Sequence, residues 1–599
     1  MPRATGDPRA RWRAPASAAL LLVPPLTLAW LGWRHRWTSE DAFILLRVVQ
    51  NLLAGHGPVW NLGERVEVYT SPLWVGLLTL VASAVGSMRL EWIGVVLGLL
   101  FSAGGLLAAE RGALRLWYAR GCVGSAVPLG GLVIAALPPC WSYATSGLES
   151  GLVFAWLGTS FWGLAALIPA LDNGRAGVSN VEPADATAPA HRAPIPLAVL
   201  IGLGPLVRPD LAVMSGGFLL LLLGGQRAAG GARPVRLIAA AAAIPVVYAI
   251  FRMGYFAALV PNTALAKEAF GVHWSQGWRY LVDFAGTYWL AVPCAALLTL
   301  LPSLVREVGG ARHWTAPALV WLPLACGLLH AVYVVRLGGD FMHGRMLLPS
   351  LFTFVLPLSV VPVRRRHAWL VALIVVPWAM ACALWLRVPY PGTIGTAGIT
   401  DERGLHAAAV GRPHPVTIDH YAGVTYDGRA LRSLAAERRA LLLRDEIAPD
   451  RPFPPEMALA PRVAARIVAA RPNIGLLGYA AGSSVHVVDR LGLGDALGSR
   501  LRVEQRGRPG HEKWLSDAWL VGRFADAAAP LPTGAPSDSA VAAARTALGC
   551  TPVKDLLDAI ESPMTTTRFL RNIWLAWRAW GLKLAPDPAR AVAELCAGP

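Results

Sequence analysis

The stretch that decides the fold class runs from Trp369 to Leu386 and reads WLVALIVVPWAMACALWL. It contains no charged residue and approaches the roughly 20 apolar residues that a helix needs to cross a bilayer. A similar run, PASAALLLVPPLTLAWLGW, begins at Pro15, and others follow up to about residue 388, where the composition turns polar. The sequence therefore predicts a polytopic α-helical membrane domain over residues 1–387 and a soluble α/β domain over residues 388–599.

Composition and charge support this division. Of 599 residues, 55% are hydrophobic and 15% are charged, whereas globular chains carry about a quarter charged residues. The net charge of +17 does not indicate a nucleic-acid partner, because the arginines lie mostly in short loops beside apolar runs, where the positive-inside rule collects them. Three such loops are expected in the cytoplasm, and they hold Arg111, Arg115 and Arg120; Arg227, Arg233 and Arg236; and Arg364 to His367.

About 11 spans are expected, at 16–33, 91–109, 125–141, 148–170, 195–207, 210–223, 236–256, 281–304, 316–336, 346–362 and 367–387. The short pair 195–207 and 210–223 is expected to be broken or re-entrant. The apolar segment 73–87 is interpreted as a membrane-dipping helix, because a further span would reverse every later loop. An odd number of spans places the C-terminal domain outside the plasma membrane, and residues 171–194 form a flexible cytoplasmic connector.

The C-terminal domain shows short strand and helix patterns. GLLGYAAG (475–482) and VHVVD (485–489) are predicted strands, and residues 431–447 a helix. Residues 568–583, RFLRNIWLAWRAWGLK, predict a basic, Trp-rich helix that either faces the core or lies on the membrane surface. Cys550 and Cys596 are the only cysteines of this domain, and an oxidising compartment favours a disulfide between them.

Polar clusters interrupt the apolar runs, and the topology places them on the outer face, beginning with the first outer loop, 34–90. Ionisable residues at membrane borders indicate functional sites. Basic groups can hold a phosphate, while a carboxylate can take a proton from an attacking hydroxyl. The candidates are Glu40, Asp41, Glu64, Glu67, Tyr69, Glu149, Arg208, Asp210, Asn262, Lys267, Asp340, His343 and Arg345.

Asp41 is the candidate catalytic base, with a helix N-cap as the alternative. Glu40 is interpreted as its orienting neighbour, since close carboxylates raise one another's pKa. His343, Arg345, Lys267 and Arg208 are candidate ligands of a donor phosphate, with lipid-headgroup contact as the alternative for a terminal arginine.

The remaining candidates are assigned to sugar or acceptor binding: Asp340, Glu149, Asp210, Glu64, Glu67, Tyr69 and Asn262. Each assignment has a structural alternative. Arg208 and Asp210 could form an ion pair at a broken helix, and Asp340 could pair with Arg336. Glu64 and Glu67 could be solvated loop charges.

These residues also carry a resemblance. The acidic pair follows the first span, and residues 47–74 read RVVQNLLAGHGPVWNLGERVEVYTSPLW. Further motifs are SGLE (146–149), RPD (208–210), PNT (261–263), GGDF (338–341), TDERG (400–404), HPVT (414–417), VVDRLGLGD (487–495) and GHEK (510–513). Together they resemble the GT-C-type glycosyltransferases that use polyprenyl-phosphate sugars, and are most similar to the actinobacterial terminal β-(1→2)-arabinofuranosyltransferases.

The resemblance implies decaprenyl-phosphoryl-arabinofuranose as the donor. It implies terminal arabinan of arabinogalactan and lipoarabinomannan as the acceptor, in cell-wall biogenesis. No cofactor is expected, although a divalent metal stays open because some relatives by fold use one. The family commonly has two aspartates where this chain has Glu40 and Asp41, so a mannosyl- or other glycosyltransferase with another acceptor is an alternative. A lipid-linked sugar transporter is a further alternative.

Overall fold

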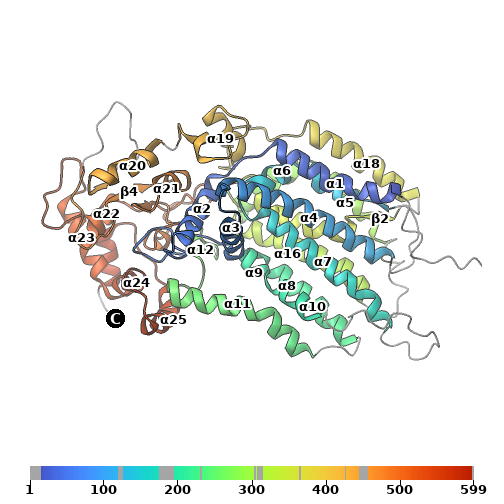
Figure 1. Ribbon diagram of the computed structural model, residues 1–599, viewed down its shortest axis with the longest axis horizontal. Helices are drawn as coiled ribbons and strands as arrows, with labels where there is room; N and C mark the ends of the chain where they lie inside the picture. The colour runs from blue at the N-terminus through green and yellow to red at the C-terminus, as the bar shows by residue number, and fades with distance from the viewer. Residues whose placement is uncertain are drawn as a thin grey trace, which may run out of the picture. The chain divides into compact units, whose positions relative to one another are not determined.

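The computed structural model describes residues 15–118, 126–173, 194–228, 233–302, 305, 315–362, 366–424, 426–443 and 456–596. Most of the predicted connector 171–194, together with Arg120, Arg364 and Arg365, lies outside the described residues. The chain divides into two compact units (Figure 1). The first comprises Met1–Arg36, Val95–Pro245 and His273–Pro391; the second comprises Trp37–Gly94, Val246–Val272 and Gly392–Pro599.

Long apolar helices make the chain a membrane protein. Six helices of the described part are long and apolar enough to cross a bilayer, and a bent pair brings the number to seven. The six stretches are Leu90–Trp117, Ser150–Leu167, Pro209–Arg227, Pro234–Phe256, Pro317–Leu337 and His367–Leu384. They lie in α4 (Leu90–Tyr118), α7 (Ser150–Asn173), η2 (Pro209–Leu211) with α10 (Ala212–Ala228), α11 (Pro234–Phe256), α16 (Thr315–Leu337) and α18 (Arg366–Leu384).

Shorter elements replace several of the predicted spans. The bent pair is α13 (Trp274–Thr287) with α14 (Ala291–Leu298), which meet at 79°. The predicted span 125–141 is divided by Pro138 into α5 (Leu129–Ala136) and α6 (Pro138–Thr145), since proline cannot continue the helical hydrogen bonding. The first predicted span, 16–33, is covered by α1 (Pro15–Arg34). The other short elements are α3 (Pro72–Val85), α8 (Pro194–Gly202), α9 (Gly204–Val207), η3 (Arg345–Leu347), α17 (Leu348–Val355) and η4 (Leu356–Leu358).

Glycine allows two of the long helices of the first unit to approach closely. A Cβ atom on Gly151 of α7 would lie 2.1 Å from the carbonyl oxygen of Gly98 on α4, and one on Gly158 would lie 2.0 Å from that of Gly105. Small residues at such a seven-residue spacing let membrane helices pack backbone against backbone, where lipid provides no hydrophobic driving force. The pairing of β1 (Ala126–Val127) with β2 (Val361–Pro362) is antiparallel.

The second unit contains the α/β domain. Its parallel sheet has the order β3 (Ala440–Leu442), β4 (Ile467–Arg471), β5 (Val485–Asp489), with Ala440 opposite Ile467 and Ile467 opposite Val485. Its helices and 3-10 turns are α2 (Glu40–Leu53), α12 (Asn262–Ala266), α19 (Glu402–Val410), η5 (Ile418–Tyr421), α20 (Tyr426–Glu437), α21 (Gly475–Ala481), η6 (Gly498–Arg500), α22 (Asp517–Phe524), α23 (Asp538–Gly549), α24 (Thr551–Glu561), α25 (Thr566–Trp580) and α26 (Pro588–Leu595).

Two local predictions for this domain were wrong. GLLGYAAG forms helix α21 rather than a strand, and its buried position in the packing against α2 and α20 explains the apolar run. The predicted helix 431–447 ends at Glu437, after which residues 440–442 form strand β3. VHVVD is a strand as predicted, and its five residues are all buried.

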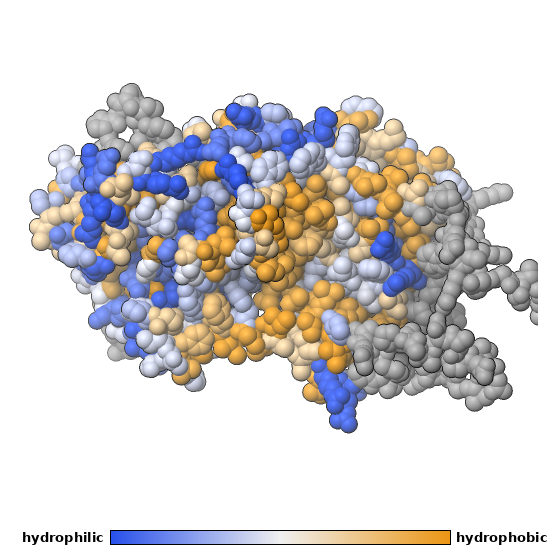
Figure 2. All heavy atoms as spheres, in the orientation of Figure 1, coloured by the Kyte–Doolittle hydropathy of each residue, from blue (hydrophilic) through white to orange (hydrophobic). Residues whose placement is uncertain are grey.

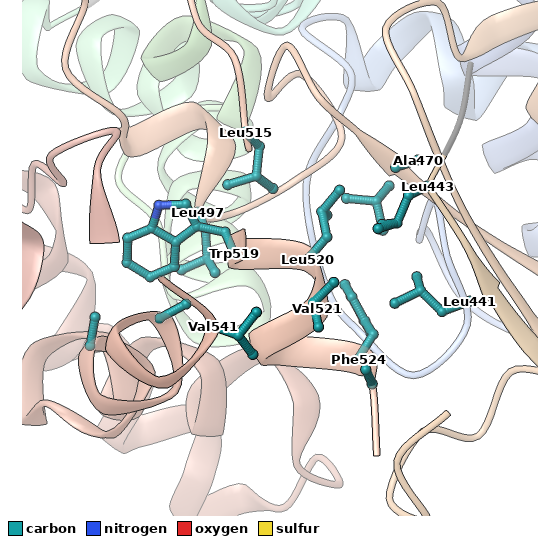
Figure 3. Packing of buried hydrophobic residues seen from close by; sticks show 14 of the residues in the cluster. Leu441, Leu443, Ala470, Leu497, Leu515, Trp519, Leu520, Val521, Phe524 and Val541 are labelled. Atoms are coloured by element: carbon teal, nitrogen blue, oxygen red, sulfur yellow. The ribbon is translucent and has the colours of Figure 1, made fainter. Parts of the chain in front are cut away.

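A hydrophobic core holds the sheet against the following helices. Leu441 and Ala470 of the strands lie in one buried cluster with Trp519 and Phe524 of α22 (Figure 3). Val468 and Val488 of the strands belong to the same cluster. Each fully buried large apolar side chain stabilises the fold by roughly 1.5–3 kcal/mol relative to exposure. Figure 2 shows hydrophilic side chains over the surface of this domain around α20, and apolar side chains over the long helices.

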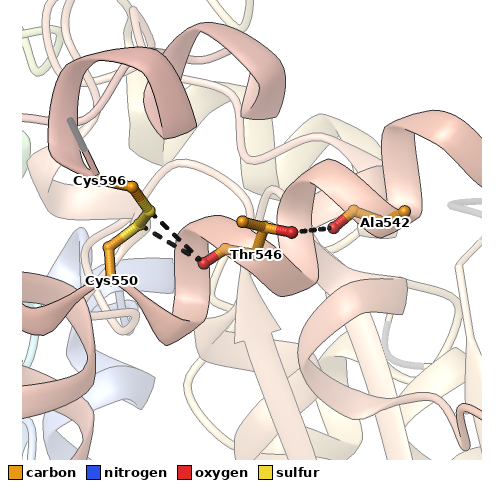
Figure 4. The surroundings of a disulfide bond; sticks show 4 residues. All are labelled: Ala542, Thr546, Cys550 and Cys596. Carbon is orange, nitrogen blue, oxygen red and sulfur yellow. Dashed lines mark hydrogen bonds between the residues drawn. A yellow bond between two sulfur atoms is a disulfide. The ribbon is translucent and has the colours of Figure 1, made fainter.

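A disulfide closes the C-terminal part of the domain. Cys550, between α23 and α24, is bonded to Cys596 after α26, with the Cα atoms 5.3 Å apart (Figure 4). The bond is the one that the sequence predicts. It ties α26 to α23, which also pack against each other.

Candidate active site

Helix α2 presents the acidic pair. Ser39 occupies the N-cap position, with extended backbone angles, and Glu40 and Asp41 are the first two residues of the helix. Asp41 is therefore not the N-cap, and that alternative is wrong. Carboxylates in the first turn interact favourably with the helix dipole.

Glu40 is seated on the backbone of α21. Its Oε1 atom accepts hydrogen bonds from the amide of Gly475 at 2.5 Å and from that of Leu476 at 3.3 Å. A Cβ atom on residue 475 would lie 2.0 Å from the carbonyl oxygen of Glu40. Only glycine lets α21 approach the acidic pair this closely.

A third carboxylate supports the same helix end. The hydroxyl of Ser39 donates to Glu402 Oε1 at 2.8 Å, and Glu402 is buried at the start of α19. The amide of Thr38 donates to the carbonyl oxygen of Pro415 at 2.9 Å. The motifs TDERG and HPVT therefore hold the N-terminus of α2.

Burial and like charge raise the pKa of Glu40 to about 8. Burial has the largest effect, the neighbouring charge of Asp41 acts in the same direction, and the amide of Gly475 opposes both. Such a carboxyl holds its proton at neutral pH.

Arg47 anchors the body of α2. It is fully buried, and its guanidinium donates to the carbonyl oxygens of Trp60 (3.0 Å), Gly478 (2.9 Å) and Val485 (2.7 Å). The arginine therefore joins α2 to the first loop, α21 and β5. Removal of the Arg47 guanidinium would leave these three carbonyl groups without its hydrogen-bond donors.

Glu64 and Asp495 are buried partners of Arg523, in an ionic cluster that the exposed Glu561 completes. The guanidinium of Arg523 lies 2.9 Å from Glu64, 2.8 Å from Asp495 and 2.7 Å from Glu561. Glu64 is only 3% exposed, so the alternative that it is a solvated loop charge is wrong. Burial raises the pKa of Glu64, and Arg523 opposes this effect.

Glu67 is likewise buried and paired. It accepts hydrogen bonds from Arg252 Nε at 2.5 Å and from the hydroxyl of Tyr248 at 2.6 Å, and that hydroxyl lies 3.3 Å from the hydroxyl of Tyr69. Arg252 and Tyr248 belong to α11, so the first loop is bound to the end of a candidate span. The solvated-charge alternative is wrong for Glu67 as well.

Asn262 binds the VVDRLGLGD segment. Its amide nitrogen donates to the carbonyl oxygens of Gly492 (2.8 Å) and Leu493 (2.9 Å), and Ser499 donates to its side-chain oxygen at 2.8 Å. Lys267 follows at the C-terminus of α12. Both residues lie in the second unit, which also holds Glu40, Asp41, Glu64, Glu67 and Tyr69.

A separate charge cluster lies in the first unit. Glu149 lies 3.0 Å from Arg345 and 3.9 Å from Arg208. Arg208 is paired with Asp210, as the structural alternative predicted, and Asp340 lies 3.9 Å from Arg345. The structure therefore brings five of the predicted residues into one buried cluster.

Two histidines border this region in different ways. His330 Nε2 lies 2.7 Å from Asp210, and its Nδ1 lies 2.7 Å from the hydroxyl of Ser350. His343 instead contacts Asp283 at 2.6 Å, and the hydroxyl of Tyr390 donates to the same carboxylate. His343 thus belongs to a group other than the Arg345 cluster.

Sequence reasoning missed several of these partners. A lone histidine inside an apolar span, as at His330, is a usable signal. Arg523, Glu402 and Asp283 are distant in sequence from the residues they contact and stand in ordinary helical patterns. Within the described part of the chain, no group of three or more His, Cys, Asp or Glu side chains is arranged to hold a metal ion.

The long apolar helices and the α/β domain define a membrane protein with a C-terminal α/β domain. Residues 461–594 match the family described as "AftB family C-terminal domain". The chain is 34% identical over 591 residues to the terminal β-(1→2)-arabinofuranosyltransferase of Mycobacterium tuberculosis (strain ATCC 25618 / H37Rv), covering 91% of each chain. It is 34% identical over 578 residues to the enzyme of the same name from Corynebacterium glutamicum, covering 91% of this chain and 82% of the relative.

The chain therefore belongs to the family of terminal β-(1→2)-arabinofuranosyltransferases. By this homology it is a glycosyltransferase with arabinofuranosyltransferase activity. No solved structure matches the chain.

Proposed function

We propose that this enzyme transfers arabinofuranose from decaprenyl-phosphoryl-arabinofuranose to the non-reducing ends of cell-wall arabinan, in arabinogalactan and lipoarabinomannan. The observation that carries the chemical part of the proposal is the acidic pair at the start of α2. Glu40 is half-buried against α21 with a raised pKa, while Asp41 stands beside it in the first turn.

In this mechanism Asp41 accepts the proton of the acceptor hydroxyl. The hydroxyl oxygen forms a bond to the anomeric carbon of arabinofuranose, and the bond from that carbon to the phosphate oxygen breaks. Decaprenyl phosphate leaves as an anion and needs no strong general acid. Glu40 is protonated at neutral pH, so Asp41 carries the only negative charge of the pair. Glu40 also orients Asp41.

For the donor phosphate we propose Arg345 and Arg208 as the principal ligands, with His343 and Lys267 as further candidates. Arg345 and Arg208 share Glu149, so two guanidinium groups are already held side by side. Asp340, Glu149 and Asp210 would orient the arginines or the sugar hydroxyls. Glu64, Glu67, Tyr69 and Asn262 would shape the acceptor site through the first loop, which their buried hydrogen bonds hold in place.

The proposed topology has a GT-C-like membrane domain over residues 1–387 and an extracytoplasmic domain over residues 388–599. The long helices, the bent pair and the shorter helices α1, α5–α6, α8–α9 and α17 would together make about 11 spans, with α3 dipping into the membrane. Arg115 near the end of α4, Arg227 at the end of α10 and Arg236 at the start of α11 favour a cytoplasmic position for those ends. The site would then face the outside of the plasma membrane.

A cell-free assay with the reconstituted enzyme and a panel of polyprenyl-phosphate sugars tests the proposal. Arabinofuranose should be transferred to a synthetic arabinan acceptor, and linkage analysis should find a terminal β-(1→2) bond. Mannose or ribose donors should give little product. Preferential transfer of another sugar would move the enzyme to one of the alternative glycosyltransferase activities.

A further inference from the structure

Helix α25, Thr566–Trp580, has two contrasting faces. The face buried in the second unit is made of small side chains, Asn572, Ala576 and Ala579. The opposite face carries Leu570, Trp574 and Trp577, which are 58%, 77% and 63% exposed. Each set recurs at spacings of four and three residues, so each forms one stripe along the helix.

Such an arrangement reverses the usual pattern of a water-facing helix. Large apolar side chains normally face the core, and a contiguous exposed apolar stripe marks an interaction surface. Tryptophan has an apolar body and a polar N–H group, and it is enriched where a membrane meets water. The stripe therefore fits a boundary that is apolar on one side and polar on the other.

The partners of α25 place it at the end of a candidate span. Asn572 Nδ2 donates to the carbonyl oxygen of Gly254 at 2.9 Å, and a Cβ atom on Gly254 would lie 2.3 Å from the ring of Phe569. Gly254 belongs to the last turn of α11. A transmembrane helix ends at the membrane–water interface, so these contacts hold α25 near that depth.

Side chains of α11 mark the same boundary. Val246 and Val247 are 51% and 66% exposed, as expected for a lipid-facing helix. Tyr248 follows directly, and Arg252 and Tyr255 come later in the same helix; tyrosine and arginine are residue types that concentrate at membrane interfaces. Tyr248 and Arg252 precede the Gly254 contact with α25, and Tyr255 follows it, so these side chains and the contact lie in the same part of α11.

Charge favours a lipid headgroup as the occupant. Arg571 and Arg578 are exposed on α25 along one side of the apolar stripe, Arg571 with Asp555 at 3.6 Å, and an amphipathic helix with basic residues beside its apolar face binds anionic lipid surfaces. We propose that α25 is an interfacial helix whose Leu570, Trp574 and Trp577 insert into the headgroup region of an anionic bilayer. This surface anchors the C-terminal domain to the membrane and is independent of the donor and acceptor proposed above.

The test uses full-length protein reconstituted in phosphatidylglycerol–phosphatidylcholine vesicles. An environment-sensitive NBD fluorophore is attached through Leu570→Cys, in a background where the five cysteines outside the disulfide are replaced by alanine. The matched control is Ser539→Cys on α23, which is exposed on a polar surface of the same domain. The Leu570 label should show blue-shifted emission and quenching by nitroxide-labelled phospholipids, whereas the Ser539 label should show neither.

Two further variants, with the same label at position 570, test whether the tryptophans and the arginines of α25 contribute to lipid binding. Trp574→Ser with Trp577→Ser should reduce lipid quenching, and Arg571→Gln with Arg578→Gln should reduce the difference between anionic and purely zwitterionic vesicles. Lipid quenching of the Leu570 label no greater than that of the Ser539 label would overturn the proposal. So would a label shielded from both lipid and aqueous quenchers, which indicates a protein occupant, or a label that responds only to added arabinan fragments.

Discussion

The side chain of Glu40 lies on the first turn of α21, with its Oε1 atom 2.5 Å from the amide nitrogen of Gly475. This contact joins the first loop to the C-terminal domain directly at the acidic pair. In the proposed mechanism it gives the α/β domain a part in the chemistry, because the amides of α21 bind Glu40 and lower its pKa against the effect of burial. The second unit therefore holds the proposed base together with the elements that position it.

The close approach of α21 predicts the effect of adding one methyl group. In Gly475→Ala the new Cβ would meet the carbonyl oxygen of Glu40, so α2 and α21 must separate, at a cost of about 1–3 kcal/mol for an overpacked contact. We expect lower turnover and a lower unfolding temperature. Gly423→Ala, where a Cβ meets no atom within 4 Å, is the control and should retain both properties.

The raised pKa of Glu40 predicts the pH dependence of turnover. Because its pKa is about 8, Glu40 loses its proton as the pH rises through that value, and a second negative charge then appears beside Asp41. Turnover of the unaltered enzyme should fall on the alkaline side with a midpoint near pH 8. In Glu40→Gln, which stays neutral, this alkaline fall should disappear while much of the activity at neutral pH remains. An unchanged alkaline limb in that variant would show that another group titrates.

The same proton affects stability in the same pH range. A carboxyl whose pKa is higher in the folded protein than in the unfolded chain binds its proton more tightly when folded. Between the unfolded value of roughly 4.3 and the folded value of about 8, this group makes the free energy of unfolding fall as the pH rises. Thermal unfolding of Glu40→Gln should therefore depend less on pH across this window.

The Arg345 cluster predicts a loss of donor affinity. A charge-assisted hydrogen bond contributes about 1.5–3 kcal/mol, so Arg345→Ala should raise the donor dissociation constant roughly 10- to 100-fold. Glu149 would keep Arg208 as a neighbour at 3.9 Å, which limits damage to the fold. Arg115→Ala, on an exposed position of α4, should leave the affinity unchanged. If Arg345→Ala also binds the donor normally, the phosphate site lies elsewhere, and Arg208 is the next residue to replace.

The Arg523 cluster predicts a large cost in stability. Arg523→Met leaves Glu64, Asp495 and Glu561 without their shared cation, and breaking a buried ion pair typically costs about 3–5 kcal/mol. The matched control is Arg502→Met, whose partner Glu594 lies on the surface, where the loss should be about 0–1 kcal/mol. Chemical unfolding of the two variants, followed in detergent, gives the comparison. Equal stability of the two would contradict a structural role for the cluster.

Much of this structure is predictable because its signals are local. Apolar length predicts a membrane protein, although six or seven helices of the described chain are long and apolar enough to cross a bilayer, against about 11 predicted spans. The acidic pair begins the helical pattern of α2. The disulfide between Cys550 and Cys596 was predictable because they are the only two cysteines of a domain expected in an oxidising compartment. The Trp-rich pattern of residues 568–583 also predicts a helix, and α25 confirms it.

Other features depend on packing that a single sequence does not reveal. GLLGYAAG is short, apolar and rich in small residues, so its pattern fits a buried strand as well as the buried helix α21. Prolines such as Pro138 divide apolar runs that length alone would make continuous. The partners of the acidic pair, Glu402 and Gly475, lie hundreds of positions away, and nothing in their neighbourhoods marks them as contacts of α2.

The role of Asp41 as the catalytic base is tested by the turnover of Asp41→Asn. It is measured with purified, reconstituted enzyme and arabinofuranosyl donor. Loss of a positioned base typically reduces the rate by ~10²–10⁴-fold, and donor binding should stay intact because the phosphate ligands are elsewhere in the chain. Glu40→Gln, measured alongside, should be much milder. Asp41→Asn should therefore be the more severe of the two substitutions. Near-normal turnover of Asp41→Asn would contradict the assignment of the base, and a greater loss in Glu40→Gln would exchange the two roles.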